Sequence, residues 1–383
     1  MNGVICRFCR SLEGEIVLDL GQQPACDHFP PVGDPGPDPT YPLRMWLCAG
    51  CGLAQLAEDP TAPDEPRGRE PNALVEQAAD AVARVAGAGL LPHAGAVAEY
   101  GSPHGGSWLG LLADRGLRSA RPGELADVVI DCFGLMHEAD QAGALAARVA
   151  RLRAGGVLLL QFHSLAAILG GGQWNALRHG HCAYYATPVL AAMLQAVGFT
   201  ARTAFRFPLY GGTVLLAATR DGAPDDAVQA VIDAELAAGV RTAGVVAGLQ
   251  REAEAAASGL AQWVAAERVA GRLVLGYSAA SRSVALLCLA GMTSEFLPAI
   301  ADASPSKRGL RMPGTGIPVV PPADLVDARP DAVLLFVPDL LPEARAMLPQ
   351  IEASGGTWVL AEPRPRPVPP PHLASEQQAD GRP

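Results

Sequence analysis

The sequence has few of the features that mark membrane or nucleic-acid-binding proteins. No apolar run is long enough to span a bilayer, and the N-terminus has no basic segment followed by an apolar core. We therefore expect a cytoplasmic protein with no membrane partner. Basic residues are scarce as well, since 29 Lys and Arg stand against 39 Asp and Glu, for a net charge of −10. That balance argues against a nucleic-acid partner and favours a small molecule.

The composition is that of a large globular protein. Its 383 residues exceed what one ordinary core holds, which predicts two or three domains. The apolar fraction of 49% and the charged fraction of 18% fit a folded chain. Apolar strand patterns at 127–131 and 157–162 flank a helical pattern at 142–152, and such alternation predicts an α/β fold with a mostly parallel sheet.

Eight cysteines are present, and four of them form two C-x-x-C pairs, Cys6 with Cys9 and Cys48 with Cys51. Thiolates two residues apart can occupy two corners of a tetrahedron around Zn²⁺. In a long chain without an export signal, a metal explains such pairs better than disulfides do. Incidental buried cysteines and redox chemistry are the alternatives. Four thiolates leave no open coordination position, so we predict a structural zinc ion.

Changes in composition predict the domain order. Prolines at 60, 63, 66 and 71 indicate a linker, and an Ala-rich helical pattern follows at 73–86. The predicted ranges are a zinc-binding domain at 1–57, a Pro-rich linker at 58–72, a Rossmann-like domain at 73–223, a helical connector at 224–271, a C-terminal Rossmann-like domain at 272–362 and a disordered tail at 363–383.

One stretch concentrates titratable and aromatic side chains. It holds two histidines two residues apart, an arginine before them and two tyrosines after them. The unperturbed pKa of histidine lies near neutrality, so such a pair is suited to moving protons. A polar surface loop is the alternative, but ligands usually bind where layered α/β units are connected. We predict that the catalytic residues are Arg178, His179, His181, Tyr184 and Tyr185.

Two strand–turn–helix segments could bind ligands. In the first, Glu99 precedes a turn with Gly101 and Gly105, which resembles the cofactor loop of Rossmann-like S-adenosylmethionine methyltransferases. In the second, a strand enters a turn of small residues before a helix, a geometry that suits a phosphate. We predict a nucleotide or phosphorylated ligand there. Arg282 and Lys307 could also be a surface residue and a turn cap. The predicted substrate-binding residues are Tyr277, Ser278, Arg282 and Lys307.

The order of these motifs resembles the sugar C-methyltransferases of deoxysugar and antibiotic biosynthesis. The resemblance rests on the two C-x-x-C pairs, on residues 20–25 and 41–56, and on residues 276–280, 302–309 and 313–318. It implies a zinc domain, a central S-adenosylmethionine-binding domain and a C-terminal Rossmann-like domain that helps to hold a nucleotide sugar. It also implies that His181 is the base that removes a proton next to a keto group, with His179 as its neighbour.

The centre of the chain departs from that family. Pro103 and His104 replace an Asn-Asp pair in the cofactor loop. Only the nineteen residues at 108–126 precede the next strand, too few for the family's ribose-binding strand and its crossover. In the family's Tyr-His-Glu-His motif, Arg178 replaces the Tyr and Gly180 replaces the Glu, which removes a carboxylate. We therefore predict a truncated central domain, with S-adenosylmethionine as a doubtful cofactor.

These features predict a tailoring enzyme on a sugar C-methyltransferase scaffold that works without S-adenosylmethionine. His181 would act as base, Arg178 would bind an anionic group or stabilise an enolate, and Tyr184 or Tyr185 would donate a hydrogen bond. The reaction would be an isomerisation, elimination or cyclisation of a biosynthetic intermediate. One alternative, supported by Glu99 and Gly101, is methyl transfer from S-adenosylmethionine to a nucleotide sugar. Another is a non-catalytic sugar-binding or partner protein.

Overall fold

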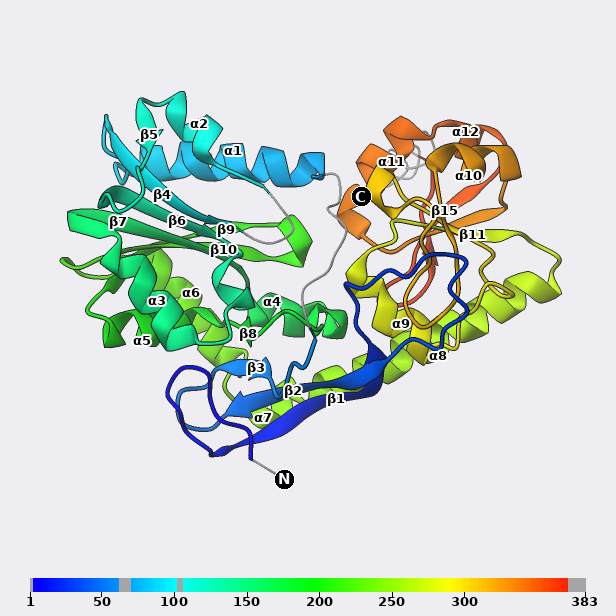
Figure 1. Cartoon of the computed structure of the whole chain (residues 1–383), viewed down its shortest axis with the longest axis horizontal. Helices are drawn as coiled ribbons and strands as arrows, with labels where there is room; N and C mark the ends of the chain where they lie inside the picture. The colour runs from blue at the N-terminus through cyan, green and yellow to red at the C-terminus, as the bar shows by residue number, and fades with distance from the viewer. Residues whose placement is uncertain (1–2, 62–69, 102–105, 371–383) are drawn as a thin grey trace, which may run out of the picture. The chain divides into compact units, whose positions relative to one another are not determined.

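A computed structural model describes residues 3–61, 70–101 and 106–370. These residues form two compact units (Figure 1). The first unit comprises the described residues of 3–21, 42–61 and 70–250, and the second comprises 22–41 and 251–370. This division places the zinc-binding segment and the central sheet in one unit, whereas the sequence analysis counts them as two domains. The predicted ranges remain predictions.

The central sheet of the first unit has six strands in the order β5-β4-β6-β7-β10-β9. Strands β5, β4, β6 and β7 run parallel, and β10 pairs antiparallel with both β7 and β9. This mostly parallel sheet confirms the predicted α/β class. The strands are β4 (Gly95–Gly101), β5 (Leu117–Ser119), β6 (Ala126–Cys132), β7 (Leu152–His163), β9 (Thr200–Phe207) and β10 (Thr213–Thr219).

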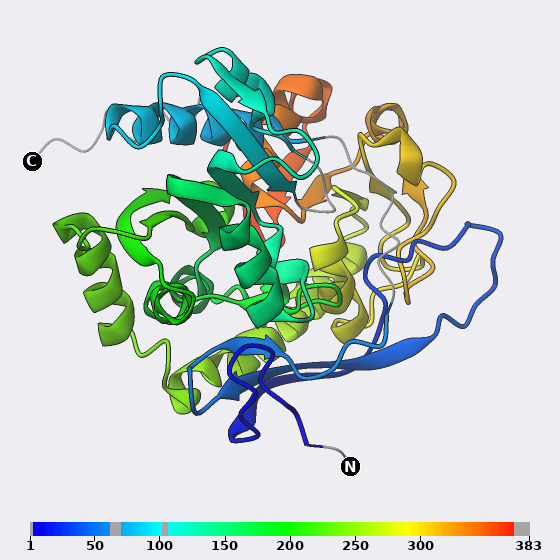
Figure 2. The ribbon, with the colours of Figure 1, turned by 60° about the vertical axis from the view of Figure 1, so that its left-hand side comes forward.

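Helices cover both faces of this sheet, with α1 on one face and α3, α5 and α6 on the other (Figure 1). Figure 2 shows the same unit after a turn of 60°. The helices are α1 (Asn72–Gly87), α2 (Leu109–Ala113), α3 (Gln141–Ala150), α4 (Leu165–Gly170), α5 (Thr187–Ala196) and α6 (Asp226–Ala237). The predicted helices at 73–86 and 142–152 are confirmed as α1 and α3.

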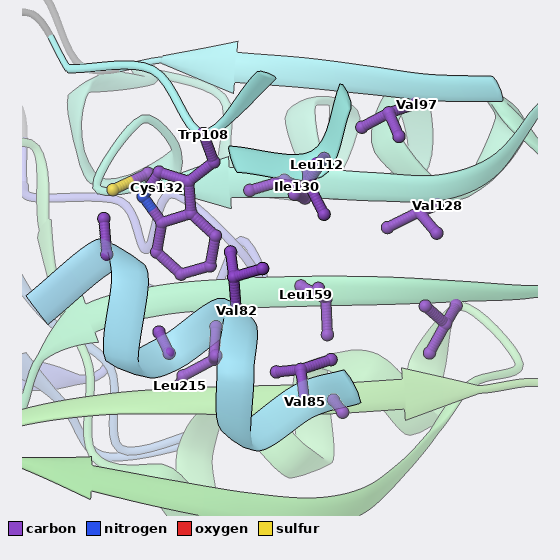
Figure 3. Packing of buried hydrophobic residues seen from close by; sticks show 14 of the residues in the cluster. Val82, Val85, Val97, Trp108, Leu112, Val128, Ile130, Cys132, Leu159 and Leu215 are labelled. Atoms are coloured by element: carbon purple, nitrogen blue, oxygen red, sulfur yellow. The ribbon is translucent and has the colours of Figure 1, made fainter. Parts of the chain in front are cut away.

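The helix α1 forms because its small apolar residues repeat at helical spacing. Ala78, Ala81, Val82 and Val85 are buried on one side of it, the i, i+3, i+4, i+7 pattern of a core-facing helix. They pack with side chains of β4, β6 and β7 and with Trp108, which is 2% exposed (Figure 3). This core fixes the strand ends at which the candidate site lies.

The prediction that the ribose-binding strand is missing was wrong. Strand β5 pairs in parallel with β4, with Gly95 opposite Leu117 and Val97 opposite Ser119. The connection fits into the short passage because α2 has only five residues and β5 only three. A full βαβ unit takes about 30 residues. The central domain is therefore shortened while this strand is kept.

A second sheet in the order β1-β2-β3-β8 carries the zinc-binding segment. Its first three strands are β1 (Gly14–Pro24), β2 (Thr40–Cys48) and β3 (Ala54–Leu56). The fourth, β8 (Ala183–Tyr184), comes from the histidine stretch and pairs antiparallel with β3. Because β8 has only two residues, it shows no periodic pattern from which a strand could be predicted. The sheet joins the histidine stretch to the cysteine-rich segment.

Three helices occupy the predicted helical connector at 224–271. They are α6, α7 (Ala243–Val246) and α8 (Gly248–Val269). The break after α6 includes Gly239, whose φ of +75° suits a residue without a side chain. No helix in the described part of the chain is both long enough and apolar enough to cross a membrane.

The second unit contains a six-stranded sheet in the order β13-β12-β11-β14-β15-β16, parallel except for β16. The strands are β11 (Val274–Tyr277), β12 (Ile300–Ala301), β13 (Val319–Val320), β14 (Ala332–Leu335), β15 (Thr357–Leu360) and β16 (Arg366–Pro367). The helices are α9 (Val284–Leu289), α10 (Pro322–Ala328), α11 (Leu341–Met347) and α12 (Gln350–Ala353).

In the second unit β12 has only two residues, because Phe296 and Leu297 donate backbone hydrogen bonds to Thr293 in a turn before it. One prediction about this unit needs correction. The tail predicted to be disordered from 363 onward includes β16, which pairs with β15. Arg345 also donates to carbonyl oxygens beyond β16. Residues 371–383 lie outside the described residues.

Candidate active site and metal centre

The two C-x-x-C pairs come together at one point of the first unit. The sulfurs of Cys6, Cys9, Cys48 and Cys51 all lie within 4.8 Å of one another, with 3.5 Å between Cys6 and Cys51. Tetrahedral zinc with Zn–S bonds of about 2.3 Å holds its sulfurs at about this spacing. The hydrogen bond between Cys6 and Cys51 lowers the pKa of Cys6 to about 5 and raises the pKa of Cys51. The four residues therefore fit a closed, structural zinc site.

The structure places a third histidine against His181. His137 lies in a 3-10 turn (Leu135–His137) after β6, and its ring centroid is 4.7 Å from that of His181 at an interplanar angle of 84°. His137 Nδ1 lies 2.9 Å from the carbonyl oxygen of Gly180. Since a carbonyl only accepts, this contact assigns the proton to Nδ1 and makes Nε2 the basic nitrogen of the neutral ring. His137 is not among the site residues predicted from the sequence.

Among the remaining residues of the predicted set, Tyr184 lies beside His181. The Tyr184 ring centroid is 6.4 Å from that of His181, and the Tyr184 hydroxyl oxygen accepts the backbone N–H of Arg178 at 3.1 Å. The Nε2 atom of His179 lies 3.3 Å from the carbonyl oxygen of Pro42, at the start of the β2 region of the zinc-binding segment. The structure thus brings His181 and Tyr184 together, while His179 is held against the cysteine-rich segment.

Tyr185 lies apart from this group in the protein interior. Its hydroxyl donates to the side-chain carbonyl of Gln141, and its ring packs edge-on against Phe162. Burial raises the pKa of Tyr185 well above its ordinary value. Gln141 in turn donates to the carbonyl oxygens of Leu135 and Glu138, on either side of His137. Tyr185 therefore contacts the residue that holds the His137 turn, and its predicted catalytic role stays a prediction.

A carboxylate that the sequence analysis missed lies beside the histidines. The backbone N–H of Gly180 donates to Asp59 Oδ2 at 2.7 Å. The other oxygen of Asp59 accepts from the N–H and the hydroxyl of Thr61, at 3.1 and 2.7 Å. Asp followed two residues later by Thr is a turn signal, but it does not reveal which loop the turn contacts. Although Gly180 replaces the family's Glu, a carboxylate still contacts this loop from a distant part of the sequence.

A buried ion pair anchors the turn that carries His137. Asp131, at the end of β6, contacts Arg148 Nε at 2.5 Å, and the two side chains are 1% and 3% exposed. Asp131 also accepts the N–H groups of Gly134 and Leu135 at 2.8 and 2.9 Å. Burial raises the pKa of Asp131, and the charge of Arg148 opposes that rise. The guanidinium of Arg148 stacks 4.4 Å from the ring centroid of Tyr100.

The predicted cofactor loop begins at the end of β4. The two carboxylate oxygens of Glu99 accept from the hydroxyl of Ser107 at 2.7 Å and from the N–H of Trp108 at 2.6 Å. Gly101 is the last residue of β4, and Gly105 lies outside the described residues. Glu99 therefore supports the turn that leads into α2.

The predicted substrate cations of the second unit are engaged within the protein. Lys307 is 4% exposed, donates to the carbonyl oxygen of Ala279 at 2.7 Å and lies 4.7 Å from the ring centroid of Phe29. The nearest atoms of Arg282 and Glu362 are 3.8 Å apart. Binding of an anion by Lys307 or Arg282 stays a prediction.

The other two predicted substrate residues lie at the end of β11. The Tyr277 ring packs edge-on against Trp358 at 5.6 Å, and its hydroxyl donates to the sulfur of Met347 at 3.6 Å. Ser278 has a φ of +71°, and the next N–H in the chain donates to Asp302 at 2.9 Å. Tyr277 therefore belongs to the core of this unit, while Ser278 begins the turn after the strand.

A cavity of about 690 Å³ lies beside the segment that follows the histidine stretch. Its lining includes Ser164, Arg206, Gly212 and Glu235. Glu235 is 5% exposed and accepts from the hydroxyl of Ser164 at 2.7 Å and from the N–H and hydroxyl of Thr187 at 2.5 and 3.0 Å. Burial raises the pKa of Glu235. These bonds make Glu235 a cap for the N-terminus of α5.

Two protein-family models match the N-terminal and C-terminal parts of the chain. Residues 6–65 match a family model described as a zinc binding domain, and residues 208–363 match the C-methyltransferase C-terminal domain. The class is therefore that of C-methyltransferase-like proteins with an N-terminal zinc-binding domain. The C-methyltransferase NovU of Streptomyces niveus is 25% identical over 267 residues, which cover 67% of this chain. The chain spans 62% of the length of that relative.

Solved methyltransferase structures also match, at low similarity. Magnesium protoporphyrin IX methyltransferase of Synechocystis is 15% identical with a TM-score of 0.28, and the match covers 39% of this chain and 84% of the other. A Burkholderia thailandensis 1,6-didemethyltoxoflavin N1-methyltransferase is 19% identical with a TM-score of 0.26, covering 43% and 94%. These scores are too low to support a conclusion. The two domain matches and NovU make this chain similar to the C-methyltransferases.

Proposed function

We propose that this protein is a biosynthetic enzyme that removes a proton from a carbon next to a carbonyl group of a small molecule. The observation that carries the proposal is the contact of His181 with His137, whose ring centroids are 4.7 Å apart. Imidazoles exchange protons near neutral pH, so two of them in contact can accept a proton and return it to another atom. Similarity to the C-methyltransferases supports a small-molecule substrate, and we propose a nucleotide-linked keto sugar.

In the proposed step, His181 takes the proton as the C–H bond breaks. The electron pair left on carbon moves onto the carbonyl oxygen, which forms an enolate. Arg178 would stabilise that negative charge, and Tyr184 would donate a hydrogen bond to it. His137 would act as the second proton-transfer group. Return of the proton at a different carbon gives an isomerisation, and loss of a neighbouring leaving group gives an elimination.

We propose further that the reaction proceeds without S-adenosylmethionine. Both oxygens of Glu99 are engaged by the turn after β4. The resemblance places a ribose-binding carboxylate in the passage at 108–126. That passage has two acidic residues. Asp114 caps the end of α2 and so precedes β5. The Oε2 atom of Glu124 accepts from Arg118 Nη1 at 2.8 Å. Neither residue follows β5 directly, where the carboxyl end of the strand would face a cofactor.

Methyl transfer is a second candidate function, and one observation favours it. Strand β5 lies parallel to β4, so the strand next to the cofactor loop is present. NovU is itself described as a C-methyltransferase. If S-adenosylmethionine binds, it would supply a methyl group for the carbon that has lost its proton. The residues of this chain would perform the same deprotonation in both cases.

Proton exchange tests the deprotonation that both functions share, and the product separates them. The protein is incubated in D₂O with a panel of thymidine-diphosphate-linked keto sugars, and deuterium incorporation and product mass are followed by mass spectrometry with and without S-adenosylmethionine. Exchange that needs His181 and His137 supports the shared step, and an isomerised or eliminated product formed without S-adenosylmethionine supports the cofactor-independent proposal. His93→Ala is the control, because His93 is exposed.

Titration calorimetry supplies the contrasting result. Micromolar, one-to-one binding of S-adenosylmethionine together with a methylated product would overturn the cofactor-independent proposal and support the second candidate. Binding of the sugar nucleotide without exchange or methylation would contradict both and support a non-catalytic sugar-binding protein.

A further inference from the structure

The first cysteine pair lies directly against the turn that carries His137. Arg7 stands between Cys6 and Cys9, and its carbonyl oxygen accepts the N–H of Gln141 at 3.2 Å. Its guanidinium donates to the carbonyl oxygen of Ala139 at 3.3 Å. One residue of the zinc-binding segment therefore contacts the chain just after His137 through both its backbone and its side chain.

The same residue contacts the strand beside His181. The N–H of Arg7 donates to the side-chain carbonyl of Gln55 at 2.8 Å, and its guanidinium lies 3.5 Å from the carbonyl oxygen of Leu56. Both residues belong to β3, which pairs with β8. The N–H of Leu56 donates to the carbonyl oxygen of Cys182, next to His181, at 3.2 Å. Arg7 thus connects the two segments that bring the imidazoles together.

The charge of Arg7 also affects Cys182, which follows His181. Burial raises the pKa of the Cys182 thiol, the Arg7 guanidinium opposes that rise, and Asp59 and Glu138 add to it. Two carboxylates therefore lie near the loop, with Arg7 as a balancing cation. Arg148 also lies close to the His137 turn, where it is engaged by Asp131 and Glu138.

We propose that Arg7 is a positioning residue through which the zinc-binding segment sets the contact between His137 and His181. The expected effect on catalysis rests on the proposed function. The role of Arg7 in holding His137 against His181 does not depend on it. Zinc would hold the Cys6–Cys9 loop rigid, and the hydrogen bonds of Arg7 would carry that rigidity to both histidine segments. The zinc-binding segment then shapes the active site while the metal itself stays closed to substrate.

The test compares Arg7→Gln with Arg7→Lys and with Arg10→Gln on the full-length, zinc-loaded protein. Arg10 lies in the same cysteine loop and is exposed, so it is a matched control for loss of a charge next to the metal. Zinc content is measured by mass spectrometry. The His137 tautomer and the contact between the rings are followed by NMR of ¹⁵N-histidine-labelled protein. Exchange activity is measured as kcat and KM.

We expect Arg7→Gln to keep its zinc but to lose the Nδ1–H signal of His137 and the ring-to-ring contact with His181. Its kcat should fall about 10- to 100-fold, because small displacements of catalytic groups are costly, while KM changes little. Arg7→Lys keeps a cation and a donor and should recover part of both signals. Arg10→Gln should match the wild type.

Three results would overturn the proposal. The first is a wild-type histidine spectrum in Arg7→Gln. The second is loss of zinc in both Arg7→Gln and Arg7→Lys, which would make Arg7 a support of the metal site alone. The third is the same spectral change in Arg10→Gln. If the histidine signals change as expected but the wild type exchanges no proton, the proposed function fails and the positioning role of Arg7 stands.

Discussion

Replacing Arg148 by methionine should destabilise the first unit strongly. The Arg148 side chain is 3% exposed and its Nε lies 2.5 Å from Asp131, which is 1% exposed. Methionine retains an apolar chain that can pack on the ring of Tyr100 but removes the charge. Asp131 would keep only the N–H donors of Gly134 and Leu135. Leaving one member of a buried ion pair uncompensated costs about 3–5 kcal/mol, so the free energy of unfolding should fall by about that amount.

The loss should depend on pH in a definite direction. Burial already raises the pKa of Asp131, and removing the guanidinium raises it further. For a pKa raised by folding, the stabilising contribution is complete below the unfolded value of about 3.9 and is lost as pH rises through the folded value. The free energy of unfolding of the variant should therefore be close to that of the wild type in acid. The difference between the two should be largest near neutral pH.

Urea unfolding at pH 5 and pH 7, followed by circular dichroism, measures both effects. Arg118→Met is the control, because it breaks an exposed pair with Glu124 and should change stability far less. In the double variant with Asp131→Asn, no buried charge is left, so it should be more stable than Arg148→Met alone. A loss below about 1 kcal/mol at pH 7, or one equal to that of Arg118→Met, would refute the reasoning.

Three further predictions concern the metal, a buried carboxyl and a buried phenol. Cys48→Ser should abolish stoichiometric zinc binding and lower the unfolding temperature, measured by metal analysis and thermal scanning; an unchanged melting curve would contradict a structural zinc. Burial raises the pKa of Glu235, so the wild type should lose stability as pH rises from about 4 to 7, and Glu235→Gln should flatten that slope in urea titrations. Tyr185→Phe leaves the acceptor of Gln141 without its hydroxyl donor and should cost about 1–3 kcal/mol in the same assay; a neutral effect would show that the bond contributes nothing.

Features that depend on residue spacing within one segment could be predicted from the sequence alone. Two C-x-x-C pairs predicted a four-cysteine site because thiolates at that spacing share a tetrahedron, and the structure brings all four sulfurs together. The Ala-rich pattern at 73–86 predicted α1 because one side of it is apolar at helical spacing. Alternating strands and helices likewise predicted a mostly parallel sheet. In each case the signal lies within one segment of the chain.

The tertiary structure decided which distant groups meet at the candidate site. Strands β5 and β8 have three and two residues, too few to show a period, and they exist because a neighbouring strand pairs with them. Gly180, next to His181, is contacted by Asp59 and His137, which lie far from it in the sequence. These contacts form because β3 pairs with β8 and because a buried ion pair holds the turn after β6. Residue types could nominate the histidines, but the proton position on His137 and the carboxylate beside the loop follow from packing between separate segments.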